Sequence, residues 1–174
     1  MDIFGIIDSM KNMMKRKSFK RDVLILIGVV LLDQISKIIV DSCFNLRESM
    51  VVIPDFFNIT YVVNTGAAWS ILQGKMSFLI AITYIAIIVM FMFYKNSRES
   101  DKLGKISLVL MMGGAIGNLI DRFMFDHVRD FLDFAIFGYE FPVFNFADVS
   151  LFLGVALLII CVFLESIGVF INEK

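Results

Sequence analysis

Four long apolar stretches limit the fold of this chain more than any other feature of its sequence. An α-helix rises about 1.5 Å per residue, so about 20 residues cross a hydrocarbon core of about 30 Å. The chain is 59% hydrophobic and contains 19 Phe, which is too apolar for an ordinary soluble domain of 174 residues. We therefore expect an all-α membrane protein, one domain over residues 1–174, with four transmembrane helices at about 23–40, 76–94, 103–120 and 149–171.

The first span contains polar residues, which argues against a cleavable signal peptide. The core of a signal peptide is uncharged and ends at a small-residue cleavage site, whereas this span contains Asp33 and Lys37. These two residues stand four positions apart, so they can pair on one face of the helix. We expect a retained helix, and the pair is either structural or part of a substrate site.

Residues 1–22 combine apolar residues at helical spacing with a basic end. An amphipathic helix on an anionic inner leaflet has this pattern. A basic tail that only sets the orientation is the other interpretation, and neither makes the segment catalytic.

β-Branched and aromatic residues fill 51–54 and 56–63, which predicts short strands outside the bilayer. The following segment, 64–70, reads NTGAAWS, and its small residues Gly66 and Ala67 would let another chain approach the backbone closely. A loop that only packs is the alternative. The fold therefore includes a small extracytoplasmic β-rich cradle and loop.

Three glycines, Gly113, Gly114 and Gly117, lie inside the third apolar stretch. No strand precedes them, so a phosphate-binding loop is not indicated. We expect them to let helices pack closely.

The distribution of Lys and Arg predicts the orientation of the spans. Eleven of these residues lie in 1–22, in 95–105 and at the C-terminal end, against four in 41–75 and 121–148. Because cytoplasmic segments are enriched in Lys and Arg, both termini should be cytoplasmic. The segments 41–75 and 121–148 then share the extracytoplasmic side and can form one site.

Composition also excludes two kinds of site. A net charge of -1 argues against nucleic-acid binding, which needs a basic face. His127 is the single histidine, and no CxxC or HxxxH spacing occurs, so we expect no metal and no cofactor.

Carboxylates are the remaining catalytic groups. When two of them lie close together, one can activate a water while its protonated partner polarises a carbonyl. A nucleophilic serine is poorly supported, because no GxSxG occurs and the adjacent Ser36 and Lys37 point in different directions on a helix. The acids of the 121–148 segment are Asp121, Asp126, Asp130, Asp133, Glu140 and Asp148.

Five short motifs, in order along the chain, resemble those of the lipoprotein signal peptidases, the type II or prolipoprotein signal peptidases of bacteria. The resemblance covers nearly all of 23–171. The motifs are DQISK at 33–37, NTGAAWS at 64–70, GGAIGNLIDR at 113–122, VRDF at 128–131 and FNFADVS at 144–150.

The resemblance implies an intramembrane aspartyl endopeptidase of the bacterial cytoplasmic membrane. Its substrates would be prolipoproteins carrying a diacylglyceryl group, cleaved before the lipidated cysteine, with membrane lipids as its surroundings. Motif positions imply that Asp130 and Asp148 are catalytic. They also imply a substrate-binding group, Asn64, Gly66, Asn118, Arg122 and Asn145, and a supporting group, Asp33, Lys37 and Asp121.

Reasoning from the residues alone leaves some of these roles open. Asp148 opens the fourth span, where a helix N-terminus favours its ionised form, and the apolar surroundings of Asp130 favour a proton there. Asp133 is a rival to Asp130, because both would face one way if this segment is helical. We expect Arg129 to face water, and Asp126 and Glu140 to be solvated loop charges.

Two other functions share the same acidic segment. A transporter or channel component could use it to attract cations, although the four spans show no inverted repeat. A lipid-binding assembly factor would use the site without hydrolysis.

Overall fold

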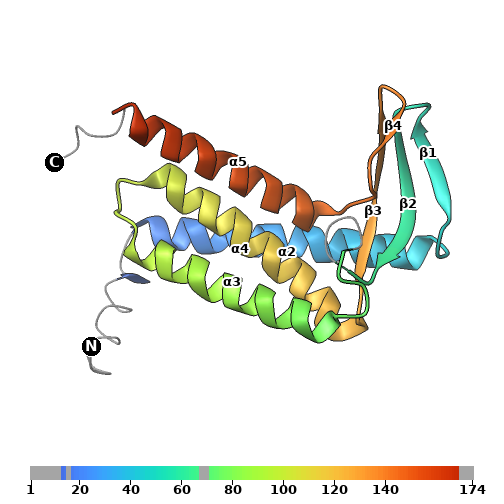
Figure 1. Ribbon diagram of the computed structural model, residues 1–174, viewed down its shortest axis with the longest axis horizontal. Helices are drawn as coiled ribbons and strands as arrows, with labels where there is room; N and C mark the ends of the chain where they lie inside the picture. The colour runs from blue at the N-terminus through green and yellow to red at the C-terminus, as the bar shows by residue number, and fades with distance from the viewer. Residues whose placement is uncertain (1–12, 15–16, 67–70, 169–174) are drawn as a thin grey trace.

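The computed structural model describes residues 13–14, 17–66 and 71–168. Within these residues, four helices are long and apolar enough to cross a membrane. They lie side by side in a bundle (Figure 1), which confirms the expected fold class. The helices are α2 (Lys17–Cys43), α3 (Met76–Asn96), α4 (Lys102–Phe125) and α5 (Phe146–Ser166).

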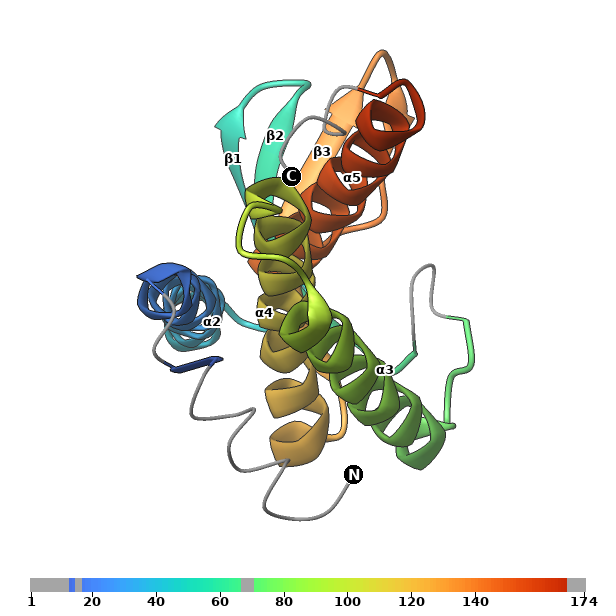
Figure 2. The same cartoon turned by 90° about the vertical axis from the view of Figure 1, so that its left-hand side faces the viewer.

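A small antiparallel sheet lies across one end of the bundle, where α2 and α4 end and α3 and α5 begin (Figures 1 and 2). Its strands pair in the order β1-β2-β3-β4. The first two strands match the predicted ones, whereas β3 and β4 come from the acidic segment, where we expected no particular strand. The strands are β1 (Ser49–Ile53), β2 (Phe57–Asn64), β3 (Val128–Ile136) and β4 (Tyr139–Glu140).

The observed helix ends differ from the predicted span ends. Helix α2 begins at Lys17, so the last residues of the predicted N-terminal segment belong to this helix, while 1–12 and 15–16 lie outside the described residues. Helix α4 continues to Phe125, where Asp126 adopts a left-handed conformation and its N–H bonds the carbonyl of Arg122. Hydropathy alone ends this helix early, because its last turns contain charged residues.

The three glycines of α4 lie where neighbouring helices pack closely against it, as predicted. A Cβ on Gly113 would lie 2.8 Å from a methyl carbon of Val29 on α2. A Cβ on Gly114 would meet the main-chain carbonyl of Ala147 on α5. Any larger residue at these positions would push α4 away from the helices that carry the polar residues of the site.

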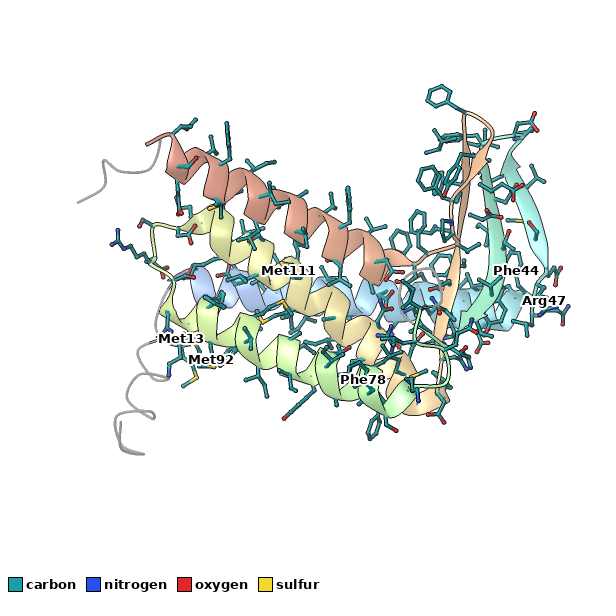
Figure 3. All side chains as sticks on the ribbon, in the orientation of Figure 1. Met13, Phe44, Arg47, Phe78, Met92 and Met111 are labelled. Carbon is teal, nitrogen blue, oxygen red and sulfur yellow. The ribbon has the colours of Figure 1, made fainter. Side chains whose placement is uncertain are left out.

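Two buried clusters hold the two ends of the molecule. Near the sheet, Val40, Tyr61, Phe131 and Leu132 join α2 to the strands. At the opposite end, Met13 packs against α3 and α4, and Figure 3 shows it near Met92, far from the sheet. The remaining apolar side chains of α3 and α5 point mostly outward, as expected for helices that contact lipid.

Candidate active site

Asp130 lies on β3 with its carboxyl turned toward the helices. The residue is only 2% exposed, and the amide Nδ2 of Asn145 donates a hydrogen bond of 2.6 Å to its Oδ1. Burial and the negative charge of Asp148 raise the pKa of Asp130 to about 7, although hydrogen bonds from Asn145 and Asn64 oppose this. The carboxyl can therefore hold a proton near neutral pH.

Asp148 lies in the first turn of α5, where it forms a capping box with Asn145. The Asp148 N–H donates to Asn145 Oδ1 at 3.0 Å, and the Asn145 N–H donates to Asp148 Oδ2 at 3.2 Å. The other oxygen, Oδ1, accepts a bond of 2.8 Å from Asn118 Nδ2. These donors and the positive end of the helix dipole stabilise the ionised carboxylate.

Asn145 and Asn118 join the two carboxyls into one hydrogen-bond network. Besides its bond to Asp130, Asn145 Nδ2 lies 3.2 Å from Asn118 Oδ1. Asn118 Oδ1 also accepts a bond of 3.0 Å from the Lys37 ammonium, so its amide nitrogen is turned toward Asp148. Each amide is held in one orientation, and the carboxyls keep fixed positions relative to each other.

A cavity of about 910 Å³ opens onto both carboxyls. Its polar wall contains Asn64, Asn118 and Arg122, and the rest of the wall is mostly apolar. The Gly66 carbonyl lies 3.4 Å from Arg122 Nη2, and Arg122 Nε has no hydrogen-bond partner among the described residues. The apolar lining consists of Val62, Val63, Val128, Phe134, Ile136, Phe141, Pro142, Val143, Phe144, Val149 and Phe152.

The structure therefore brings together the residues that the sequence assigned to substrate binding. Asn64, Asn118 and Arg122 line the cavity, Gly66 bonds Arg122, and Asn145 bonds Asp130 from beneath. Ala67 and Trp69 of the same loop motif lie outside the described residues.

The three predicted supporting residues form a buried charge cluster below the site. Lys37 Nζ lies 2.9 Å from Asp33 Oδ2 and 3.4 Å from Asp121 Oδ2, and all three side chains are fully buried. Asp33 Oδ1 also accepts the N–H of Ala147 at 2.9 Å, which fixes the start of α5 against α2. Pairing of this kind is what makes buried charges tolerable.

The sequence predicts that Arg129 faces water, but the residue is buried and only 3% exposed. Its Nη2 lies 2.8 Å from Asp121 Oδ1, its Nε bonds Asp121 Oδ2 at 3.2 Å, and its guanidinium stacks on the Phe125 ring at 4.6 Å. The prediction was wrong because neighbouring residues of a strand point to opposite faces. Asp130 faces the cavity, so Arg129 is directed toward α4, where Asp121 pairs with it.

Gln34 is a second residue whose place the sequence did not reveal. Its amide nitrogen Nε2 donates to Asp121 Oδ1 at 3.1 Å and to the Gly117 carbonyl at 3.0 Å. Its amide oxygen Oε1 accepts from Arg129 at 3.3 Å. Its place beside Asp33 in the DQISK motif at 33–37 was a signal in the sequence, but it indicated no role for Gln34.

Asp133, the rival of Asp130, lies outside the cavity wall. The segment is a strand and not a helix, so residues three apart face opposite ways. Asp133 Oδ2 accepts a bond of 2.6 Å from the hydroxyl of Thr60 on β2. Asp126 and Glu140 are exposed, as expected, but Glu140 lies on β4 and not in a loop.

Two solved structures share this architecture. One, described as a bacterial membrane enzyme at 2.3 Å resolution, is 40% identical, covers 89% of this chain and 94% of its own, and superposes with a TM-score of 0.82. A second bacterial membrane enzyme, at 1.9 Å resolution, is 43% identical, with coverages of 82% and 92% and a TM-score of 0.77. Fold and site together define a multi-pass membrane enzyme of bacterial type.

The family of this enzyme follows from its sequence relatives. Residues 25–164 match the model of the signal peptidase (SPase) II family, and the chain belongs to that family and is a peptidase. The lipoprotein signal peptidase of Staphylococcus aureus (strain bovine RF122 / ET3-1) is 42% identical over 88% of this chain and 94% of the relative. The corresponding protein of Staphylococcus haemolyticus (strain JCSC1435) is 40% identical, with coverages of 88% and 98%.

Proposed function

We propose that this chain is an intramembrane aspartyl endopeptidase that removes the signal peptide from diacylglyceryl-modified prolipoproteins. Family membership carries the removal of signal peptides from prolipoproteins. The aspartyl mechanism rests on one observation: Asp130 and Asp148 line one cavity and are joined through Asn145. Cleavage would fall before the lipidated cysteine, as the motifs imply.

The hydrogen bonds favour one division of labour between the two carboxyls. Asp130, with a pKa near 7, starts in the protonated form and donates to the scissile carbonyl oxygen. The Asp148 carboxylate takes a proton from a water as the water oxygen attacks the carbonyl carbon. The proton on Asp148 then passes to the departing amine, the C–N bond breaks, and Asp130 regains its proton from the new carboxylic acid. The two carboxyls titrate as a pair.

The cavity wall matches a substrate with a polar reacting bond and a long apolar part. Its volume of about 910 Å³ lies within the usual range of ligand sites. Arg122 and Asn64 would bind main-chain carbonyl and amide groups near the cleaved bond, and the unpaired Arg122 Nε is a donor available for this purpose among the described residues. The apolar wall would hold acyl chains.

The proposed orientation places the site on the extracytoplasmic side. The basic residues of the α3–α4 connection lie at the end of the bundle opposite the sheet (Figure 1). If that end is cytoplasmic, α2 begins and α5 ends on the cytoplasmic side, and the site opens where prolipoproteins arrive after export.

Single Asp→Asn substitutions test the proposal. Asp130→Asn and Asp148→Asn should each abolish cleavage of a synthetic lipidated precursor by the purified protein, because one carboxyl beside one amide cannot both activate water and donate a proton. Asp133→Asn is the matched control, since Asp133 lies on the same strand but outside the cavity wall. It should retain cleavage.

The variants must also remain folded, which a thermal melt in detergent measures. Full activity of either Asp130→Asn or Asp148→Asn would overturn the assignment. In proteoliposomes, ion flux without cleavage by the unaltered protein would instead support the transporter alternative.

A further inference from the structure

The turn between β3 and β4 presents an aromatic side chain that nothing in the described chain covers. Phe137 is fully exposed, at 105% of its reference area. Its φ is +53°, and the next residue, Gly138, has φ +79°, so the two form the left-handed turn that joins short hairpins. Gly, or Asn with its short polar side chain, normally occupies the first position, because a bulky side chain is disfavoured in the left-handed conformation. A large ring is thus held outward in an unfavourable backbone conformation.

Further apolar residues surround this ring on the same hairpin. Ile136, Tyr139 and Phe141 are also exposed, and the rings of Tyr139 and Phe141 pack edge to face at 5.0 Å. Neither the stretch 48–64 nor the stretch 130–148 contains a Lys or an Arg. The surface is therefore suited to an apolar and uncharged partner, and not to an anionic one. We call Ile136, Phe137, Tyr139 and Phe141 the hairpin tip.

The hairpin tip continues the lipid-facing surface of α5. Ile136 and Phe141 line the same cavity as Val149 and Phe152 of α5, and Phe152 is 72% exposed. Figures 1 and 2 both show the β3–β4 hairpin running across the bundle axis and extending past the outer side of α5. Lipids that surround the first turns of α5 would therefore lie directly beneath the hairpin. Aromatic residues, Tyr among them, concentrate at this depth of a bilayer.

We propose that the hairpin tip is an interfacial anchor that inserts the Phe137 ring into the bilayer leaflet next to the start of α5. The anchor goes beyond the peptidase activity, since it concerns how the sheet is held on the membrane. It keeps the mouth of the cavity between hairpin and α5 facing acyl chains instead of water. A lipid-bearing ligand can then enter sideways.

Spin-label accessibility tests this anchor without any need for catalysis. The full-length chain, with Cys43→Ala and Cys161→Ala, would carry one labelled cysteine at Phe137→Cys and be placed in phosphatidylcholine nanodiscs. The control label is at Arg47→Cys; Arg47 is exposed in the turn between α2 and β1, at the end of the molecule opposite the α3–α4 connection (Figure 3). The label at 137 should collide several-fold more with oxygen, relative to a water-soluble nickel complex, than the label at 47.

A second comparison isolates the ring from the turn. With the label at Glu140→Cys, the change Phe137→Asn should move the label toward water, whereas the melting temperature in detergent should not fall, because Asn suits the left-handed turn. Equal nickel accessibility at 137 and 47 would overturn the proposal. Dipolar broadening between labels at 137 in discs holding two copies would overturn it as well, because it would assign the hairpin tip to a second copy of this chain.

Discussion

Replacing Arg129 by Met tests how strongly the site depends on the buried ion pair behind it. The guanidinium makes two side-chain hydrogen bonds with Asp121, of 3.2 and 2.8 Å, and Met would fill the space without bonding. Hydrogen bonds to charged groups contribute about 1.5–3 kcal/mol each, and removal of one partner of a buried pair costs about 3–5 kcal/mol.

The expected loss lies at the low end of that range. Lys37 remains 3.4 Å from Asp121, and the Arg129 main-chain N–H still bonds Asp121 at 3.0 Å. We therefore expect the free energy of unfolding to fall by about 3 kcal/mol. For a chain of this size, 1 kcal/mol changes the melting temperature by about 2–4 °C, so the midpoint should fall by about 6–12 °C.

The assay is thermal unfolding of purified protein in one detergent at one scan rate. Arg47→Met is the matched control, because Arg47 is exposed in the turn between α2 and β1 and should change the midpoint little. In a double-mutant cycle with Asp121→Asn, the destabilisation of the double mutant should differ clearly from the sum of the two single destabilisations. If Arg129→Met melts within about 1 °C of the control, or if the destabilisations of the two single variants simply add in the double variant, the ion pair does not support the site.

Four other outcomes follow from the geometry. Burial and the charge of Asp148 raise the pKa of Asp130 to about 7 from about 3.9 when unfolded, so cleavage should decline above pH 7 in a pH profile of kcat/KM. Between these two pKa values the folded state holds a proton on Asp130 that the unfolded state has lost. The contribution of Asp130 to the free energy of unfolding is therefore full below about pH 4 and is lost as the pH rises through 7. Asp130→Asn should make the melting temperature less dependent on pH over this range. Gly114→Val should lower the melting temperature strongly and Gly28→Ala, where nothing lies near the added carbon, should not; similar melts would refute the close packing of α4 and α5. Hydrogen bonds from Ser18 and Lys105 lower the pKa of Glu99 to about 2, so its small stabilisation is lost as the pH falls from about 4.3 toward 2, and Glu99→Gln should melt like the parent chain only at the acidic end.

Hydropathy predicts the four helices because lipid leaves a spanning segment few alternatives. It fails at their ends, since charged residues continue a helix when the fold pairs them. Asp121 extends α4 only because Lys37 and Arg129 reach it from α2 and β3. Such partners are far away in the sequence and cannot be recognised from local composition.

The choice between Asp130 and Asp133 shows a similar limit. Residue spacing could separate them only if the secondary structure of the acidic segment were known, and the motif resemblance favoured Asp130 without explaining it. Pairing of β3 with β2 supplies the physical reason, because Asp130 pairs with Val62 and Asp133 with Asn58 across a bulge. The same pairing turns Arg129 inward.

The capping box at the start of α5 gives Asp148 two duties that cannot be tuned separately. Its Oδ2 accepts the Asn145 N–H, and N-cap interactions contribute about 0.5–2 kcal/mol to a helix. Under the proposed mechanism Asp148 takes up a proton once per turnover, which weakens it as an acceptor. The first turn of α5 would then lose part of its N-terminal cap when Asp148 is protonated and regain it when Asp148 releases the proton, once in every cleavage. Amide exchange in that turn would report catalysis directly.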